Sequence, residues 1–198
     1  ITNVVFTGED VFVLAKDEAP PVISDAMTGA GPVPFYLCML QELMPWGTLE
    51  DLAKEGELSP AIAFKTLEDV ASTLASMHGE NVTHRDVKPE NVMLQVDGDE
   101  ITAAKMCDLG RAEALEESQG FADDIRRFGV TLFSVFTGEP WTKNRLIHEE
   151  HEALVARLAQ AVSASEDDAL RRLPALLKQI LDGDMTMEQV AASIRELG

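Results

Sequence analysis

The first third of the chain alternates short apolar runs with turn residues, a pattern that predicts β-strands. Residues 3–16, NVVFTGEDVFVLAK, place two apolar β-branched runs around a Thr-Gly-Glu-Asp turn and predict a hairpin or a bent strand. Residues 17–34 are rich in Pro and Gly, which predicts an exposed connection. Residues 35–43, FYLCMLQEL, form an unbroken apolar run and predict a strand buried on both faces.

Beyond residue 44 the apolar spacing becomes helical. Residues 44–56, MPWGTLEDLAKEG, predict a turn followed by a short helix. Ser59 and Pro60 provide a cap and a first helical position for a long helix that ends near Gly79. The apolar positions at helical spacing within it are Ala63, Leu67, Val70, Ala71, Leu74 and Met77.

The second half of the chain combines one more hairpin with several helices. Residues 91–109, NVMLQVDGDEITAAKMCDL, contain two short runs joined across Asp97-Gly98 and predict a β-hairpin. Residues 125–136, IRRFGVTLFSVF, are apolar nearly all round, which predicts a helix at the centre of a bundle. Further helices are predicted at residues 148–161, at residues 170–182 and after a capping box of Thr186 and Gln189.

The composition narrows the classes of function. The 198 residues carry 16 basic and 35 acidic side chains, a net charge of −19, which argues against a nucleic-acid or anionic-membrane partner. An ATP-binding protein can still be this acidic when Mg²⁺ and a few local cations mask the phosphates. Hydrophobic content of 45% and the lack of an 18-residue apolar run predict a soluble globular protein without a transmembrane span.

Other general features carry less weight. Cys38 and Cys107 lie in apolar runs and are expected to be small core residues, not partners in a disulfide. No signal peptide is evident, and the chain begins at Ile1, which predicts processing, trimming or further residues upstream.

The most informative stretch is NVTHRDVKPENVML, residues 81–94, because it concentrates polar side chains that are costly to bury unless they are paired. Asp86, Lys88 and Asn91 follow one another closely, and Asp108 comes after the predicted hairpin. Phosphoryl transfer needs a carboxylate for the attacking hydroxyl, a cation near the phosphoryl group and oxygen ligands for Mg²⁺. The sequence supplies each of these parts in order.

The block His84-Arg85-Asp86-x-Lys88-x-x-Asn91, followed by Asp108-Leu109-Gly110, resembles the catalytic and metal-binding loops of eukaryotic-type protein kinases. The resemblance implies that Asp86 orients the substrate hydroxyl and accepts its proton, and that Lys88 neutralises the γ-phosphate. It also implies that Asn91 and Asp108 hold Mg²⁺. Lys88 favours the Ser/Thr class, since tyrosine-specific kinases favour Ala or Arg arrangements at this place. Small-molecule phosphotransferases of the aminoglycoside type keep the His-x-Asp and Asn but generally lack this lysine.

The resemblance extends to both sides of this block. LCMLQELMPWGTLEDL, residues 37–52, is similar to the strand, hinge and helix that contact ATP, with Gln41 at the gatekeeper position. By that match the backbone of Glu42 and Met44 contacts adenine, and Met93 packs beneath the ring. DDIRRFGVTLFSVFTGEPW resembles the central helix of the large kinase lobe, in which Asp124 braces the backbone of the catalytic loop.

The part of the chain that would bind phosphate departs from the kinase pattern. No Gly-rich loop is present, since TGAGPVP lies between strands in the wrong place. Lys16 ends a run similar to Val-Ala-Ile-Lys, but only 25 residues separate it from Glu42, too few for a helix and two strands. We therefore interpret Lys16 as an ordinary exposed lysine outside the nucleotide site.

The segment after the loop that resembles a metal-binding loop also departs from the kinase pattern. Only 13 residues lie between Gly110 and Asp124, and the Ala-Pro-Glu motif is missing. Either the activation segment is truly short, or a mobile loop has been left out. We predict the second, with at least one pair of consecutive Cα atoms between Gly110 and Asp124, preferentially between Glu113 and Phe121, much farther apart than 3.80 Å. Leu109 replaces the usual Phe and is expected to fill the same apolar slot. Arg85, without a phosphorylated loop, is expected to pair with a nearby carboxylate.

These observations lead to a fold and a function. We predict an α+β, protein-kinase-like fold with a mainly helical C-lobe and a reduced or incomplete β-rich N-lobe. Residues 1–44 would supply the N-lobe strands and hinge, and residues 45–198 the C-lobe. The expected function is ATP- and Mg²⁺-dependent phosphorylation of Ser or Thr in a protein substrate.

Two alternatives stay open. The chain could be a pseudokinase or kinase-like scaffold that binds a partner protein, or, third in order, a small-molecule phosphotransferase. The arrangement of FTGEDVFVLAKDEAP before PFYLCML is similar to the secreted rhoptry kinases of apicomplexan parasites, one branch of which lacks the Gly-rich loop. That resemblance would imply secretion into a vacuole or host cell; otherwise the compartment is left open.

Overall fold

The computed structural model describes residues 2–7, 10–14, 35–40, 47–55, 58–97, 100–115 and 121–198. The chain divides into two compact units, Ile1–Leu43 and Met44–Gly198, each of which has its own internal packing. Among the described residues, no helix is long and apolar enough to cross a membrane.

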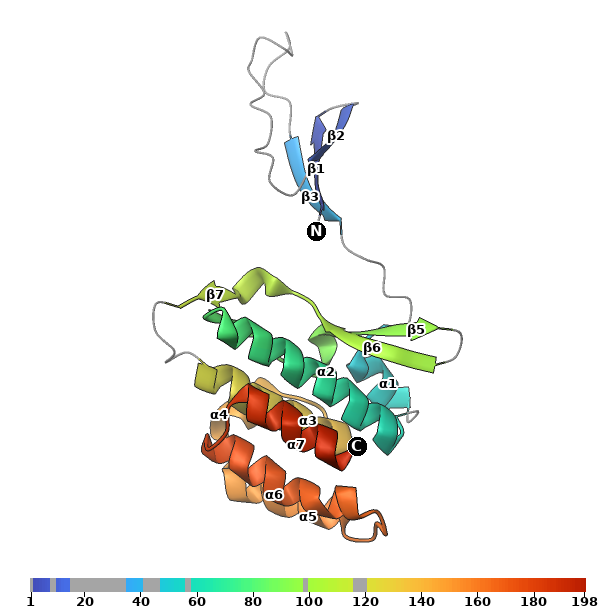
Figure 1. Cartoon of the computed structure of the whole chain (residues 1–198), viewed down its shortest axis with the longest axis vertical. Helices are drawn as coiled ribbons and strands as arrows, with labels where there is room; N and C mark the ends of the chain where they lie inside the picture. The colour runs from blue at the N-terminus through green and yellow to red at the C-terminus, as the bar shows by residue number, and fades with distance from the viewer. Residues whose placement is uncertain are drawn as a thin grey trace. The chain divides into compact units, whose positions relative to one another are not determined.

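The N-terminal unit contains a three-stranded antiparallel sheet (Figure 1). Strand β1, Thr2–Thr7, lies between β2, Asp10–Leu14, and β3, Phe35–Leu40. β1 and β2 are consecutive and antiparallel, which confirms the predicted hairpin. β3 confirms the third predicted strand. Lys16, Gln41, Glu42 and Met44 lie outside the described residues.

The C-terminal unit begins with two helices whose first turns are capped, the second of them by the residues that the sequence predicts. In α1, Leu49–Glu55, the backbone N–H of Thr48 donates to Asp51 Oδ2 at 3.0 Å. In α2, Pro60–Gly79, Ser59 Oγ accepts from the backbone N–H of Ile62 at 3.3 Å, and Pro60 is the first helical residue. The apolar face of α2 is buried, including its predicted core positions from Ala63 to Leu74.

The segment between α2 and the next long helix carries short strands and turns. Strand β4, Val82–Thr83, pairs with β7, Glu113–Ala114, and the predicted hairpin is formed by β5, Val92–Asp97, and β6, Glu100–Met106. Two 3₁₀ turns lie between these strands, η2 at Pro89–Asn91 and η3 at Leu109–Arg111. Asp69 of α2 accepts from the backbone N–H of Ala104 at 2.9 Å, which fastens the hairpin to the helix.

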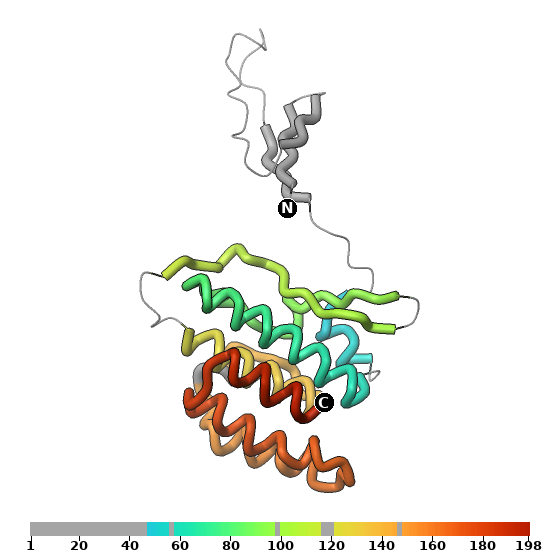
Figure 2. Tube along the Cα trace, viewed as in Figure 1, coloured from blue at the N-terminus to red at the C-terminus, as the bar shows by residue number. Residues whose placement is uncertain are grey.

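The helix α3, Phe121–Thr137, occupies the centre of the C-terminal unit, as predicted. It packs against α2 on one side and against α5, His151–Val162, and α6, Asp168–Asp182, on the other (Figure 2). All of its residues from Phe128 to Val135 are buried. α7, Met187–Leu197, packs on α2 and opens with the predicted Thr186–Gln189 capping box.

One helix was not predicted. α4, Lys143–His148, is six residues long and is capped by Thr142, whose hydroxyl accepts from the backbone N–H of Arg145 at 3.1 Å. The helix expected at residues 148–161 begins at His151, after this short element. The predicted fold class, a mainly helical C-lobe with a small β-rich part, is confirmed.

Gly129 allows α3 and α6 to approach closely, which gives a test of this packing. A Cβ at Gly129 would lie 2.8 Å from Leu181 Cδ2 and 3.1 Å from Ile180 Cγ2. We expect Gly129→Ala to lower the free energy of unfolding by about 1–3 kcal/mol, because the packed side chains of Ile180 and Leu181 must shift or the two helices must separate. Gly79→Ala is the matched control, since its Cβ meets nothing within 4 Å. Urea denaturation that gives equal midpoints for the two variants would contradict this packing.

Candidate active site

A buried carboxylate on α3 holds the loop that carries Asp86. Asp124 is fully buried, and its carboxylate accepts hydrogen bonds from the backbone N–H groups of His84 at 2.8 Å and Arg85 at 2.7 Å. These two N–H groups belong to the turn that immediately precedes Asp86. The prediction that Asp124 braces the backbone of this loop is confirmed.

Two side chains complete the coordination of Asp124. Thr83 Oγ1 donates to Asp124 Oδ2 at 2.9 Å, and His78 Nε2 lies 3.0 Å from the same oxygen. Burial alone would raise the pKa of Asp124, but the hydrogen bonds from His78, His84, Arg85 and Thr83 outweigh it and lower the pKa. The carboxylate is therefore charged near neutral pH, although it lies in the interior of the unit.

The turn at Arg85 needs this support because its backbone is in the left-handed region. Arg85 has φ of 64°, which is costly for a residue with a side chain. Its guanidinium forms an ion pair with Glu113 of β7, and both side chains are about half exposed. The predicted pairing of Arg85 with a nearby carboxylate is confirmed.

His84 links the loop to the segment that leads to Asp108. Its ring is fully buried, with Nε2 3.1 Å from the carbonyl oxygen of Cys107 and Nδ1 3.3 Å from the backbone N of Asp86. Because a carbonyl only accepts, Nε2 must carry the proton, and Nδ1 then accepts from Asp86 N–H. The backbone N–H of Cys107 also donates to the carbonyl of Asn91 at 2.9 Å. Both backbone polar groups of Cys107, its carbonyl and its N–H, are therefore hydrogen-bonded.

The Cys107 thiol itself is half-buried and is not in a disulfide. Burial, with a smaller effect of Asp108, raises the pKa of this thiol, so it stays protonated at neutral pH. Its contribution to the site comes from its backbone, which fixes the position of the next residue, Asp108.

Asp86 is nearly buried, with 7% of the residue exposed. Its Oδ2 lies 3.1 Å from Lys88 Nζ and 3.1 Å from Asn91 Nδ2, which also donates to the Asp86 carbonyl at 2.8 Å. Burial would raise the pKa of Asp86, but hydrogen bonds from Lys88 and Asn91 and the charges of Lys88 and Arg111 lower it. Asp86 is therefore ionised and able to accept a proton.

The other oxygen of Asp86 faces two arginines that the sequence patterns did not identify. Arg111 Nη1 lies 3.5 Å and Arg127 Nη1 3.9 Å from Asp86 Oδ1. Arg127 is three residues after Asp124 and so shares its face of α3, a spacing that could have predicted its position. Arg111 directly follows Gly110, and no local pattern pointed to it.

Asp108 is placed by its backbone and not by contacts of its side chain with Asp86. Its φ of 60° and ψ of 68° begin the η3 turn, and its carboxylate accepts from Gly110 N–H at 3.3 Å. Asn91 uses its Nδ2 for Asp86, which leaves its Oδ1 available to a cation. One carboxylate, one amide oxygen and substrate phosphates are a suitable ligand set for Mg²⁺. Within the described ranges, no three His, Cys, Asp or Glu side chains gather into a metal-binding group.

The expected position of Leu109 is wrong. Leu109 is 52% exposed, so it does not fill an apolar slot within the C-terminal unit. The left-handed backbone of Asp108 turns the chain into η3, and this turn carries the side chain of Leu109 outward.

The predicted nucleotide contacts are only partly within the described residues. Met93 is half-buried on β5, where it pairs with Lys105 of β6 and forms a bridge to Thr48. Its predicted place beneath adenine stays a prediction, as do the contacts of Glu42 and Met44. The stretch for which a chain break is predicted contains residues 116–120, which lie outside the described residues, so the break stays a prediction.

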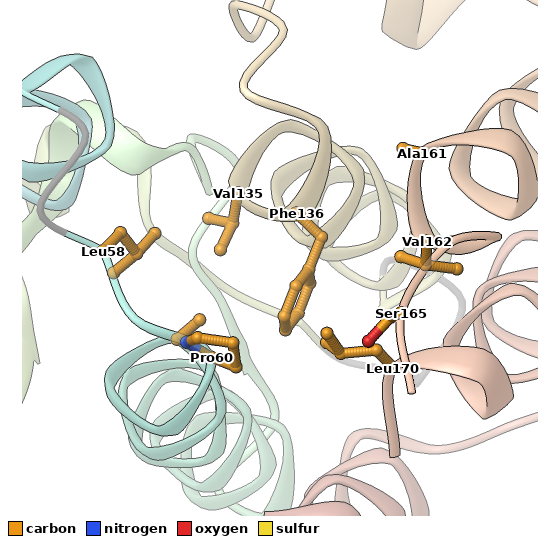
Figure 3. A pocket seen from close by; sticks show the side chains of 9 residues that line it. Leu58, Pro60, Val135, Phe136, Ala161, Val162, Ser165 and Leu170 are labelled. Carbon is orange, nitrogen blue, oxygen red and sulfur yellow. The ribbon is translucent and has the colours of Figure 1, made fainter. Parts of the chain in front are cut away.

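An apolar pocket of about 190 Å³ lies elsewhere, at the ends of α2, α3, α5 and α6 (Figure 3). Val135, Phe136, Val162 and Leu170 point into it, with Ser165 at its edge. None of the predicted site residues lines this pocket.

Comparison with known proteins finds protein kinases, in agreement with the resemblance of the residues that form the candidate site. A family model described as the protein kinase domain matches residues 25–127, just over half of the chain. The serine/threonine-protein kinase PknB of Mycobacterium tuberculosis is 29% identical over 143 residues, which cover 59% of this chain and 22% of PknB. PknL of the same organism, also named a serine/threonine-protein kinase, is 31% identical over 145 residues, covering 62% of this chain and 36% of PknL. The matched region is therefore about a fifth to a third of these relatives.

Removal of the Asp124 carboxylate tests its role as the support of the loop. We expect Asp124→Ala to lower the free energy of unfolding by about 3–5 kcal/mol, because buried hydrogen-bond donors lose their shared acceptor. Asp123→Ala is the matched control: this neighbour is half-exposed and should cost less than about 1 kcal/mol. Chemical denaturation followed by circular dichroism measures both, and equal losses would contradict the assignment.

The lowered pKa of Asp124 also predicts the pH dependence of that difference. A carboxyl group with a lower pKa in the folded state stabilises the fold above its unfolded pKa, and this stabilisation is lost as the pH falls through the folded pKa. The difference in stability between the wild-type protein and Asp124→Ala should be constant from about pH 7 to 5 and shrink below about pH 4. A difference that grows on acidification would show that Asp124 is not held as the anion.

Proposed function

The chain belongs to the protein kinase domain family, and on that premise we propose that it transfers the γ-phosphate of ATP to a serine or threonine hydroxyl of a protein. The observation that carries the proposal is the pairing of ionised Asp86 with Lys88 and Asn91 on a loop held by a buried carboxylate. PknB and PknL support the choice of serine and threonine, because both are named as kinases of that class.

In this proposal Asp86 is the residue that orients the acceptor hydroxyl and takes its proton. Its pKa is lowered, so it is present as the base at neutral pH. A base of this kind does not need a high proton affinity if its main work is to align the hydroxyl with the phosphoryl group. The hydrogen bond from Asn91 and the ion pair with Lys88 fix the carboxylate in one orientation.

Lys88 supplies the cation for the transferred phosphoryl group. Burial would lower its pKa, but its hydrogen bonds to Asp86 and Glu90 raise it, so the ammonium group is charged throughout the neutral range. Lys88 Nζ lies 3.1 Å from Asp86 Oδ2 and 3.2 Å from Glu90 Oε2, so the ammonium group is held directly beside the proposed base. It can therefore contact the acceptor oxygen and the phosphoryl oxygens together.

Asn91 and Asp108 are proposed to hold Mg²⁺, with Glu42, Met44 and Met93 around the adenine of ATP. The bound metal would neutralise charge on the phosphates during transfer. The support for the pair is that Asn91 and Asp108 are joined through the backbone of Cys107, one residue before Asp108.

The pseudokinase and scaffold alternative predicts no transfer, and the small-molecule alternative predicts an acceptor other than protein. Neither gains support from the described site, in which Asp86, Lys88 and Asn91 are all present and in contact. PknB and PknL are mycobacterial proteins, and the proposal includes no parasite origin and no secretion.

The replacement Asp86→Asn separates the reaction from nucleotide binding. We expect phosphate transfer to a generic protein substrate to fall by about 10²–10⁴-fold, with ATP affinity nearly unchanged, because the base acts on the acceptor and not on ATP. Transfer is measured with radiolabelled ATP and Mg²⁺, and affinity with a fluorescent ATP analogue.

Asp184→Asn is the matched control, because this exposed aspartate lies beyond α6 and outside the site. Equal loss of transfer and of ATP binding in Asp86→Asn would show that Asp86 supports the structure instead. Wild-type protein that binds ATP but transfers no phosphate would favour the pseudokinase alternative.

A further inference from the structure

The two oxygens of the Asp86 carboxylate have different surroundings. Oδ2 lies 3.1 Å from Lys88 Nζ and 3.1 Å from Asn91 Nδ2, and both are hydrogen-bonding distances. Oδ1 faces Arg111 at 3.5 Å and Arg127 at 3.9 Å, both longer than a good hydrogen bond. Oδ1 is therefore the oxygen that an acceptor hydroxyl can reach, and the hydroxyl would arrive beside two guanidinium groups.

The two arginines differ in their freedom to move. The Arg127 side chain is 12% exposed, and its Nε donates to Asp123 at 2.6 Å, so it is held in place on α3. The Arg111 side chain is 67% exposed and extends from the short η3 turn. Arg111 can leave Asp86 without disturbing packed neighbours, whereas Arg127 cannot.

Arg111 also differs from its neighbours in its ion pairs. Lys88 pairs with Glu90 as well as Asp86, Arg127 pairs with Asp123 as well as Asp86, and Arg85 pairs with Glu113. Among the described residues, Arg111 is the one cation of this cluster whose carboxylate partner is Asp86 alone. When a hydroxyl takes Oδ1, Arg111 is the cation that loses its partner.

We propose that Arg111 recognises a carboxylate beside the acceptor hydroxyl, so that the favoured substrate is a serine or threonine flanked by Asp or Glu. This inference rests on the proposed function. A flanking carboxylate replaces Asp86 as the partner of Arg111 and leaves Oδ1 to the hydroxyl. A neutral neighbour leaves Arg111 to compete with the hydroxyl for Oδ1, and a basic neighbour is repelled.

Peptide binding tests this specificity without requiring transfer. Three fluorescein-labelled peptides are used that differ only at the two positions beside a central serine, which carry Glu, Gln or Lys. Their dissociation constants for the 198-residue chain are measured by fluorescence anisotropy at low salt. We expect the Glu peptide to bind about fivefold more tightly than the Gln peptide, and this ratio to decrease in high salt.

Variants at position 111 test whether Arg111 causes the preference for the Glu peptide. Arg111→Gln should bring the ratio of the Glu and Gln peptides close to one, and Arg111→Glu should favour the Lys peptide. Arg172→Gln removes an equal charge from an exposed site on α6 and should keep the wild-type ratio. A ratio near one in the wild-type protein, or an unchanged ratio in Arg111→Gln, would overturn the proposal.

Transfer to the same peptides with ATP and Mg²⁺ separates this inference from the proposed function. Transfer without a preference between the Glu and Gln peptides would refute the role of Arg111 and leave the kinase activity in place. A preference in binding without any transfer would refute the kinase activity and support Arg111 as a recognition residue.

Discussion

The hydrogen bonds to the buried carboxylate of Asp124 are the interactions on which the geometry of the candidate site depends. This carboxylate gathers His78 from the end of α2, Thr83 from β4 and the backbone of His84 and Arg85 around one pair of oxygens. A charge in such a place is tolerated only because donors surround it. The same contacts offset the cost of a left-handed turn at Arg85, and so determine where Asp86 points.

Local signals in the sequence were sufficient to predict most of the helices and strands. The hairpins, the Ser59 and Thr186 caps and the central helix follow from turn residues, capping side chains and apolar spacing, each of which acts within a few residues. α4 was missed because six residues are too few to show a helical period. The prediction for Leu109 was wrong because it compared only the sizes of the Leu and Phe side chains. The exposure of Leu109 depends on the backbone conformation of Asp108, which that comparison does not include.

Some residues of the candidate site could likewise be predicted from the sequence, and others could not. Asp86, Lys88 and Asn91 are close in sequence, and their spacing was enough to predict that they act together. Arg111 and Arg127 come to Asp86 from a turn and a helix far along the chain, so their approach depends on how α3 and η3 pack. The surroundings of Asp86 Oδ1 are thus a property of the tertiary structure, even though each of the residues is visible in the sequence.

The spacing of the contacts to Asp124 has a consequence for folding kinetics. The hydrogen bonds that link it to the loop join residues 39 to 46 positions apart, all within the C-terminal unit. Contacts of this sequence separation are long-range, so they form only once α2, β4 and α3 have come together and the entropy cost of closing the chain between them has been met. The orientation of the Asp86 carboxylate is then fixed by the folding of the C-terminal unit itself.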